Sequence, residues 1–338
     1  MDVSEYKRIF FDIGLPCETH MKNNSAKLQD AIEYSWVDTL APTWTKPYLR
    51  LSRVDRPIGT WLLLIPCWWG LCLGIMQSGN GISFYQIWIA LGCGLGAILM
   101  RGAGCTWNDI NDRKLDAQVQ RTKMRPIPSG QITVVNAYFW MAFQGLLSFL
   151  ILLTFPLASI ILGFAALFPV LIYPFAKRFT WWPQVFLGIA FNWGILLGFS
   201  TQGIGVTLPC ILFYIAAIFW TLFYDTIYAF QDIEDDSIIG IKSTARLFNT
   251  NAHTWLFRFI LCFLVISTIS FFLSLFQISF GIFLFCLLGI LTFCGSLYYQ
   301  LMGLDINNPT KCLSLFRANK TSGLILTAFL LISILVYY

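Results

Sequence analysis

Two acidic segments stand at the ends of long apolar stretches in a chain that otherwise has few charges. In the first, Asn108, Asp112 and Asp116 recur at four-residue intervals, and Asp109 stands three residues before Asp112. On a continuous helix this spacing places all four side chains on or near one face. Carboxylates stacked in this way repel one another unless a cation lies between them. Mg²⁺ that also binds phosphate oxygens is the natural candidate.

The second segment repeats the pattern, because Asp232 and Asp236 are also four residues apart. A solvated acidic loop would explain either segment alone. Two segments together with nearby bases favour a site for a metal-bound diphosphate instead. The bases that could meet the phosphate charge are Arg113, Lys114, Arg121, Lys123, Arg125, Lys177 and Lys242.

The elements that must position these groups are membrane helices. Of the 338 residues, 57% are hydrophobic and 12% are charged, and the mean hydropathy is +0.69. A helix needs about 20 apolar residues to cross a bilayer. Nine stretches qualify: 57–76, 83–107, 134–155, 156–176, 183–202, 208–230, 255–275, 278–301 and 321–338. We predict an all-α polytopic membrane protein with nine spans around a central cavity.

The loops between these stretches divide the charges between two faces. The connections 77–82, 203–207 and 276–277 contain no Lys or Arg, and all 22 Lys and Arg residues and all 17 Asp and Glu residues map to the other face. By the positive-inside rule that face is cytoplasmic, or its organellar equivalent. Both acidic segments leave the membrane there, since their spans are four apart. The net charge of +5 therefore reflects topology, and no nucleic-acid-binding module is visible.

The domain organisation follows from the same pattern. Residues 48–338 are predicted to form one transmembrane domain, and residues 1–47 a partly disordered extension on the cytoplasmic side. The acidic residues of this extension are unlike a mitochondrial transit peptide. A bacterial inner membrane with a cytoplasmic active face is therefore the first expectation, and a mitochondrial inner membrane with the active face in the matrix is the alternative. Gly70 with Gly74, and Gly92, Gly94 and Gly96, are predicted as close contacts between helices.

The motifs together resemble a known family. Asn108–Asp116, Arg121-Thr-x-x-Arg125-Pro, Tyr173-Pro-Phe-Ala-Lys177 and Asp232-x-x-x-Asp236 before Gly240-Ile-Lys-Ser-Thr244 are similar to the signature of the UbiA superfamily of intramembrane prenyltransferases. Asp55–Thr60, Arg101–Cys105 and Tyr224–Ala229 resemble its 4-hydroxybenzoate polyprenyltransferase branch, the membrane step of ubiquinone synthesis. The resemblance covers about residues 48–335.

The resemblance implies a Mg²⁺-dependent reaction between a polyprenyl diphosphate and 4-hydroxybenzoate. Catalysis would depend on Asp112, Asp116, Asp232 and Asp236. These four and Asn108 would hold Mg²⁺, with Asp109 as a further ligand or a support. Arg121, Arg125, Lys177 and Lys242 would contact the diphosphate. Arg56 is the first choice for the acceptor carboxylate and Arg101 the second, Asn192 could bind a substrate oxygen, and aromatic rings including Tyr173 could line the path of an allylic cation.

Two alternatives stay open at this point. A prenyltransferase of the same family could act on homogentisate, dihydroxynaphthoate or protohaem. Only the resemblance of the local sequences around Arg101 and Tyr224 disfavours this. From a different class, an ion-coupled transporter could also use paired acids. Transporter sites lie near the middle of the membrane, whereas these acids stand at the ends of the spans.

Overall fold

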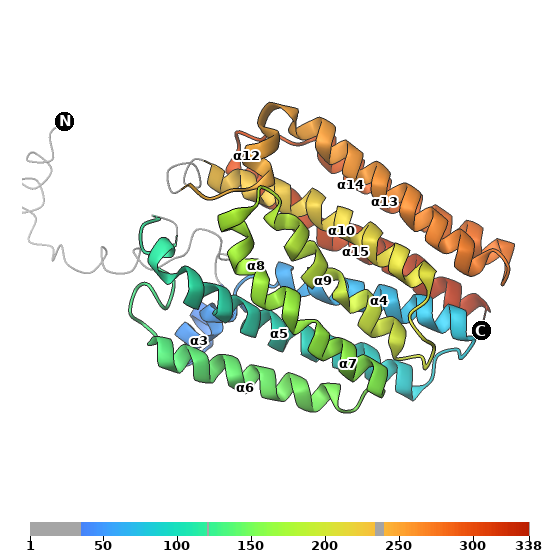
Figure 1. Cartoon of the computed structure of the whole chain (residues 1–338), viewed down its shortest axis with the longest axis horizontal. Helices are drawn as coiled ribbons and strands as arrows, with labels where there is room; N and C mark the ends of the chain where they lie inside the picture. The colour runs from blue at the N-terminus through green and yellow to red at the C-terminus, as the bar shows by residue number, and fades with distance from the viewer. Residues whose placement is uncertain (1–34, 120–121, 234–239, 338) are drawn as a thin grey trace, which may run out of the picture.

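The computed structural model describes residues 35–119, 122–233 and 240–337, and within these ranges the chain is helical with no strand. Two short helices, α2 (Trp36–Thr39) and α3 (Lys46–Leu51), precede nine helices that are long and apolar enough to span a membrane. Figure 1 shows these long helices side by side. Their bounds are α4 Ile58–Ser78, α5 Phe84–Asp116, α6 Val134–Leu152, α7 Leu157–Ala165 continued by α8 Leu167–Phe179, α9 Pro183–Ser200, α10 Leu208–Ala229, α13 Ala252–Leu275, α14 Phe280–Met302 and α15 Pro309–Tyr337. The prediction of an all-α membrane fold with nine spans is confirmed.

Local sequence signals explain where several helices begin and end. Ser83 and Gln86 form a capping box at the start of α5, which satisfies backbone N–H groups that lack a partner inside the helix. Thr133 and Thr207 cap α6 and α10 in a similar way. Gly79 ends α4 with a φ of 71°, a left-handed conformation that glycine adopts without steric cost.

Three helices differ clearly from the predicted stretches. The second span, predicted over 83–107, continues as a helix to Asp116. The fourth span is divided at Ala166 into α7 and α8, and Pro169 in the first turn of α8 cannot donate the backbone hydrogen bond that would continue one helix. The last span begins at Pro309 rather than at residue 321. Proline is favoured in the first turn of a helix, which explains the start at Pro309. The prediction missed this start because Lys311, Arg317 and Lys320 lower the mean hydropathy of the first turns.

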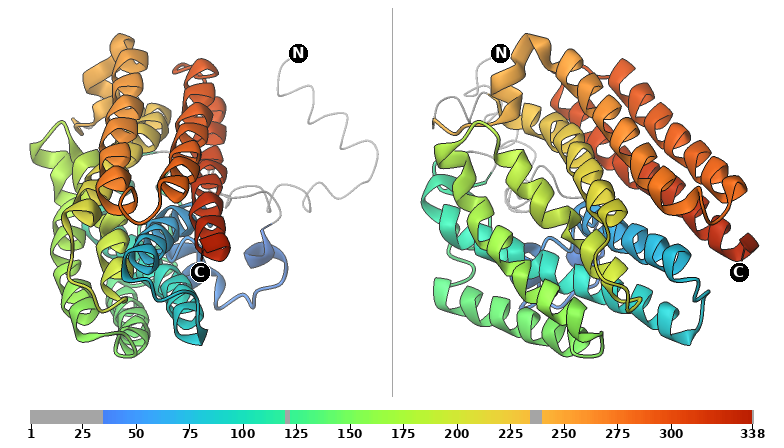
Figure 2. Two further views of the ribbon diagram at one scale, coloured as in Figure 1. Left: turned by 90° about the vertical axis from the view of Figure 1, so that its right-hand side faces the viewer. Right: turned by 45° about the vertical axis from the view of Figure 1, so that its right-hand side comes forward.

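The centre of the bundle is α4, which packs closely against α9 (Figure 2). A Cβ atom on Gly70 would lie 2.0 Å from the carbonyl oxygen of Ile195, and one on Gly74 would lie 3.0 Å from that of Phe199. The prediction of close helix contacts is therefore confirmed for these two glycines. Trp69 is fully buried on another side of α4, where its ring stacks with Phe213.

Beyond the last turn of α10 the chain forms a short 3-10 turn, η1 (Phe230–Asp232). After residues 234–239, which lie outside the described part, α12 (Thr244–Phe248) and the 3-10 turn η2 (Asn249–Asn251) lead into α13. These segments stand at the same end of the bundle as the last turn of α5 (Figure 1). The fold thus brings Asp232 to the same end of the bundle as the first acidic segment, as predicted, whereas Asp236 lies outside the described residues.

Candidate active site

A cavity of about 630 Å³ lies between α5, α6, α7–α8 and α9. Its polar end is lined by Arg53, Arg101, Asn108, Asp109, Arg125, Tyr173 and Tyr228, and the remainder of its wall is mainly apolar. Tyr228 belongs to α10 and stands one turn before Asp232. α5, which carries the first acidic segment, and α10, which leads to Asp232, therefore border the same cavity.

The apolar part of the cavity follows α5 toward the opposite membrane face. Gly92, Gly96, Met100, Gly104 and Asn108 recur at four-residue intervals along this helix, and all five line the cavity. At a rise of about 1.5 Å per residue, the wall extends roughly 24 Å from Asn108 to Gly92. It is long enough for an extended hydrocarbon chain.

The same cavity opens sideways between α6 and α7–α8. Leu146, Phe164 and Leu167 line it, yet 56%, 55% and 40% of their surfaces are exposed. In a membrane, exposed apolar surface of this kind faces lipid. An apolar ligand can therefore extend from the cavity into the bilayer without crossing water.

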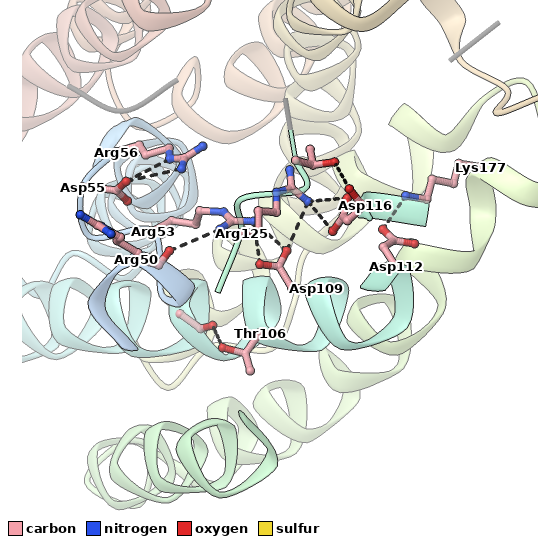
Figure 3. A network of polar contacts seen from close by, with 12 residues as sticks. Arg50, Arg53, Asp55, Arg56, Thr106, Asp109, Asp112, Asp116, Arg125 and Lys177 are labelled. Atoms are coloured by element: carbon pink, nitrogen blue, oxygen red, sulfur yellow. Dashed lines mark hydrogen bonds and ion pairs between the residues drawn. The ribbon is translucent and has the colours of Figure 1, made fainter. Parts of the chain in front are cut away.

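Asp109 and Asp116 are held by arginines, of which Arg53 is buried and Arg125 is partly buried (Figure 3). Arg53 Nη2 donates to both oxygens of Asp109, at 2.7 and 2.9 Å. Arg125 Nη1 donates to both oxygens of Asp116, at 2.9 and 2.8 Å, and lies 3.4 Å from Asp109. Both oxygens of Asp109 accept from Arg53, which favours the supporting role for Asp109 over metal binding.

Arg53 is the member of this network that the sequence analysis did not single out. It is buried, and its φ of 57° is unusual for a residue with a side chain. Burial alone would lower the pKa of Arg53, but the charge of Asp109, with smaller contributions from Asp55 and Asp116, raises it above the ordinary value. Arg53 therefore carries a full charge at any physiological pH. The sequence shows an Arg beside the first span, but no local pattern indicates that its partner is 56 residues away.

One carboxylate oxygen of Asp112 has no hydrogen-bond partner among the described residues. Lys177 Nζ lies 2.5 Å from Asp112 Oδ2, as Figure 3 shows. The other oxygen, Oδ1, is buried and accepts no hydrogen bond from the described residues, and Arg178 Nη2 is 3.7 Å away. A buried anionic oxygen without a hydrogen bond is unfavourable unless a ligand or ion meets it.

Within the described residues, no three His, Cys, Asp or Glu side chains converge on a preformed metal centre. The oxygens of Asn108, Asp112 and Asp232 nevertheless suit Mg²⁺, which uses few protein ligands and keeps several waters or phosphate oxygens. Asp236 and Arg121, predicted for the metal and the diphosphate, lie outside the described residues.

Several predicted site residues are not part of the described cavity wall, namely Arg56, Asp112, Asp116, Lys177, Asn192, Asp232 and Lys242. Arg56 contacts the neighbouring Asp55, with Nε 3.4 Å from Oδ2. Asn192 is buried in α9, where its Nδ2 donates to Thr221 and to the carbonyl of Gly188. Lys242 Nζ lies 3.5 Å from the carbonyl oxygen of Phe179, and its backbone N–H donates to Lys177.

Arg101, the second choice for the acceptor carboxylate, does line the cavity. Its guanidinium carbon lies 5.6 Å from the centre of the Phe191 ring, and its Nε is buried without a hydrogen-bond partner among the described residues. A Cβ atom on Gly59 would collide with this guanidinium at 2.4 Å. Tyr173, the aromatic residue suggested for the path of a cation, lines the cavity together with Tyr228, Phe191 and Trp193. The hydroxyl of Tyr224 instead accepts a hydrogen bond from Thr221.

Comparison with known proteins agrees with this geometry. The sequence profile of the UbiA prenyltransferase family matches residues 63–333. The chain belongs to this family. The mitochondrial 4-hydroxybenzoate polyprenyltransferase of Bos taurus is 42% identical over 287 residues, which cover 85% of this chain and 75% of the bovine protein. The Homo sapiens protein of the same name is 41% identical, with 84% of this chain and 74% of the human protein covered.

Solved structures of distant UbiA homologues share the fold. A UbiA homologue from Archaeoglobus fulgidus bound to GPP and Mg²⁺ superimposes with a TM-score of 0.62 and 21% identity, covering 85% of this chain and 99% of that protein. The apo structure of a UbiA homologue from Aeropyrum pernix gives a TM-score of 0.58 and 20% identity, covering 81% and 97%. At this identity the likeness establishes the arrangement of helices.

Proposed function

We propose that the protein transfers a polyprenyl group from polyprenyl diphosphate to 4-hydroxybenzoate, at the ring carbon ortho to the hydroxyl group, as a membrane step of ubiquinone synthesis. The observation that supports this most strongly is the cavity. One end is lined by Asp109, Arg101 and Arg125, next to Asp112 and Asp116 on the same helix, and the long apolar part opens to lipid. Relatives more than 40% identical carry the name of this activity.

The donor's diphosphate belongs at the polar end. Asn108, Asp112, Asp116 and Asp232, with Asp236, would hold Mg²⁺, which when bound neutralises the diphosphate and stabilises it as a leaving group. Arg125 and Lys177 already stand beside the carboxylates and would turn to the phosphate oxygens. The allylic C–O bond breaks, the diphosphate leaves with the electron pair, and the ring carbon attacks the allylic cation before losing its proton.

The acceptor carboxylate is best matched by Arg101. It lies on the cavity wall beside Phe191 and has a buried N–H without a described partner, whereas Arg56 contacts Asp55 away from that wall. We therefore propose Arg101, the second choice from the sequence, in place of Arg56, the first choice. Tyr173 and Tyr228 also line the cavity, and the π face of an aromatic ring can stabilise a developing cation.

The similar proteins also bear on the compartment. The bovine and human relatives are both named as mitochondrial. We therefore propose the mitochondrial inner membrane, with the active face in the matrix, in place of the bacterial membrane expected first.

The decisive experiment uses membranes that contain the expressed protein, radiolabelled 4-hydroxybenzoate and a long-chain polyprenyl diphosphate. Labelled lipid should form with Mg²⁺ and not with excess chelator. Homogentisate and dihydroxynaphthoate, supplied at the same concentration, should give far less product. Transfer to one of these and not to 4-hydroxybenzoate would reassign the acceptor, and no transfer to any of them would refute the proposal.

Arginine variants test the acceptor assignment separately. Arg101→Ala should raise the apparent KM for 4-hydroxybenzoate by roughly 10- to 100-fold, corresponding to a charge-assisted bond of about 1.5–3 kcal/mol. The KM for the donor should change little. Arg56→Ala is the matched comparison. A larger increase in the KM for 4-hydroxybenzoate in Arg56→Ala than in Arg101→Ala would indicate that Arg56 binds the acceptor carboxylate.

A further inference from the structure

A second cavity lies on the face of α9 that points away from the candidate active site. It has a volume of about 580 Å³ and forms a groove between α9, α10 and α13. Among the described residues, none that lines this groove also lines the active-site cavity. Its lining side chains are aliphatic or aromatic, apart from the thiol of Cys262 and the guanidinium of Arg258.

The groove extends from the active face of the membrane toward the bilayer centre. On α10 it runs from Leu222 to Ile215, and on α13 from Trp255, in the first turn, to Cys262. At a rise of about 1.5 Å per residue, each interval is roughly 10 Å long. Ile215 and Leu261 are 37% and 41% exposed, so the groove is open to lipid. It can hold the upper part of one acyl chain, with the remainder in the bilayer.

Tryptophan rings border the groove at its end nearest the active face. The ring centres of Trp182, just before α9, and Trp255 are 6.0 Å apart. Both rings also contact Phe248 of α12, at 5.3 and 4.9 Å between ring centres. Tryptophan is enriched where a bilayer meets water. This cluster therefore places the upper end of the groove at the level of the lipid headgroups.

Arg258 is the charged side chain of the groove wall. It is exposed, and its guanidinium carbon lies 4.8 Å from the centre of the Trp255 ring. It forms no ion pair with any carboxylate in the described part of the chain. Lys242 and Arg246 stand over the neighbouring Trp181, at 5.9 and 5.4 Å. Basic groups between membrane helices attract anionic headgroups, and an arginine can donate two hydrogen bonds to one phosphate.

We propose that this groove binds an anionic phospholipid, with the phosphate at Arg258 and one acyl chain between α10 and α13. The positive charge meets the phosphate, and the apolar wall below it matches the start of the chain. A free phosphate ion would use the charge and leave the apolar wall uncovered. The site is separate from the active-site cavity, and the inference does not rest on the proposed function.

The test compares two phospholipids with identical acyl chains. Dioleoyl phosphatidylglycerol is anionic, whereas dioleoyl phosphatidylcholine has no net charge. Each is titrated into the protein in detergent, and bound lipid is counted by native mass spectrometry. The first phosphatidylglycerol should bind at about tenfold lower concentration than the first phosphatidylcholine. Arg258→Gln should abolish this difference, whereas Arg258→Lys should preserve most of it because the charge is kept.

A second variant tests the apolar part of the groove. Cys262→Trp would fill the space below Arg258 and should weaken phosphatidylglycerol binding by about tenfold or more, although the arginine is unchanged. Lys311→Gln is the control, since Lys311 is an exposed cation at the start of α15. It should leave the preference for phosphatidylglycerol intact. Arg258→Gln changes an exposed side chain and covers the case in which the tryptophan variant does not fold.

Three results would overturn the proposal. The first is equal binding of the two lipids by the unchanged protein, and the second is an equal loss in Lys311→Gln and Arg258→Gln, since the preference would then follow total charge. The third is normal phosphatidylglycerol binding in Cys262→Trp, which would leave the groove without a role. A dimer that excludes lipid would also overturn it and assign the groove to a second copy of the chain. No prenyl transfer is measured, so these outcomes are independent of the proposed function.

Discussion

Asp109 and Asp112 are three residues apart on one helix, yet their surroundings predict opposite roles. Asp109 is neutralised by a buried arginine, whereas Asp112 has a buried oxygen that accepts no hydrogen bond from the described residues. Asp112→Asn should lower kcat by roughly three orders of magnitude at any Mg²⁺ concentration, because the lost charge weakens a metal contribution of several kcal/mol. The folded state should persist, as measured by thermal melting in detergent.

Asp305→Asn, an exposed carboxylate in the loop before α15, is the control and should retain full activity. Normal turnover in Asp112→Asn would contradict a role in metal binding and indicate that the first acidic segment is only structural.

The Arg53–Asp109 pair should contribute to stability and not directly to chemistry. Removing one partner of a buried ion pair leaves an uncompensated charge and typically costs about 3–5 kcal/mol. Arg53→Leu should therefore lower the free energy of unfolding by about that amount in a denaturant titration. Adding Asp109→Leu should recover part of the loss, because the buried charge is then removed as well. A double variant that loses the sum of both single effects would contradict this assignment.

At the scale of helices, glycines with the same appearance in the sequence have different roles. Gly70→Ala should destabilise the bundle at or beyond the upper end of the roughly 1–3 kcal/mol typical of overpacking. Its Cβ atom would meet the backbone of α9 at 2.0 Å, and neither helix can move without disturbing the other. Thermal melting should show a clear decrease.

Gly145→Ala is the comparison, since it faces open space. It should be neutral or should stabilise α6 by up to about 1 kcal/mol through helix propensity. Equal melting temperatures for the two variants would refute the close approach of α4 and α9.

The spans themselves were predictable because a bilayer requires long apolar helices. The extension of α5 through Asp116 also followed from the four-residue spacing of its polar side chains. The break at Ala166 and the early start of α15 at Pro309 were missed, since a hydropathy scan averages over single prolines and lysines. The ion-pair partners of Arg53 and Arg125 could not be predicted from the sequence, because they depend on how α5 packs against distant loops.

For the whole molecule, the ion pairs predict how the protein responds to loss of metal. Asp116 pairs with Arg125 and Asp112 with Lys177 in the structure, so these acids are partly neutralised before any cation arrives. Excess EDTA should therefore stop prenyl transfer reversibly and leave the melting temperature unchanged. Parallel assays of transfer and of thermal melting check this, and a marked decrease in melting temperature would indicate that metal also holds the fold together.

The sideways opening beside Leu146 and Phe164 determines which concentration of donor the enzyme responds to. The donor and the prenylated product both reside in the bilayer, so each arrives and departs by diffusion in two dimensions. The rate should then follow the mole fraction of donor in the membrane, and diluting the donor with inert phospholipid should slow the reaction at constant bulk concentration. 4-Hydroxybenzoate enters from water and keeps an ordinary molar dependence. The next enzyme that acts on the product must therefore collect it from the same lipid leaflet or by direct contact.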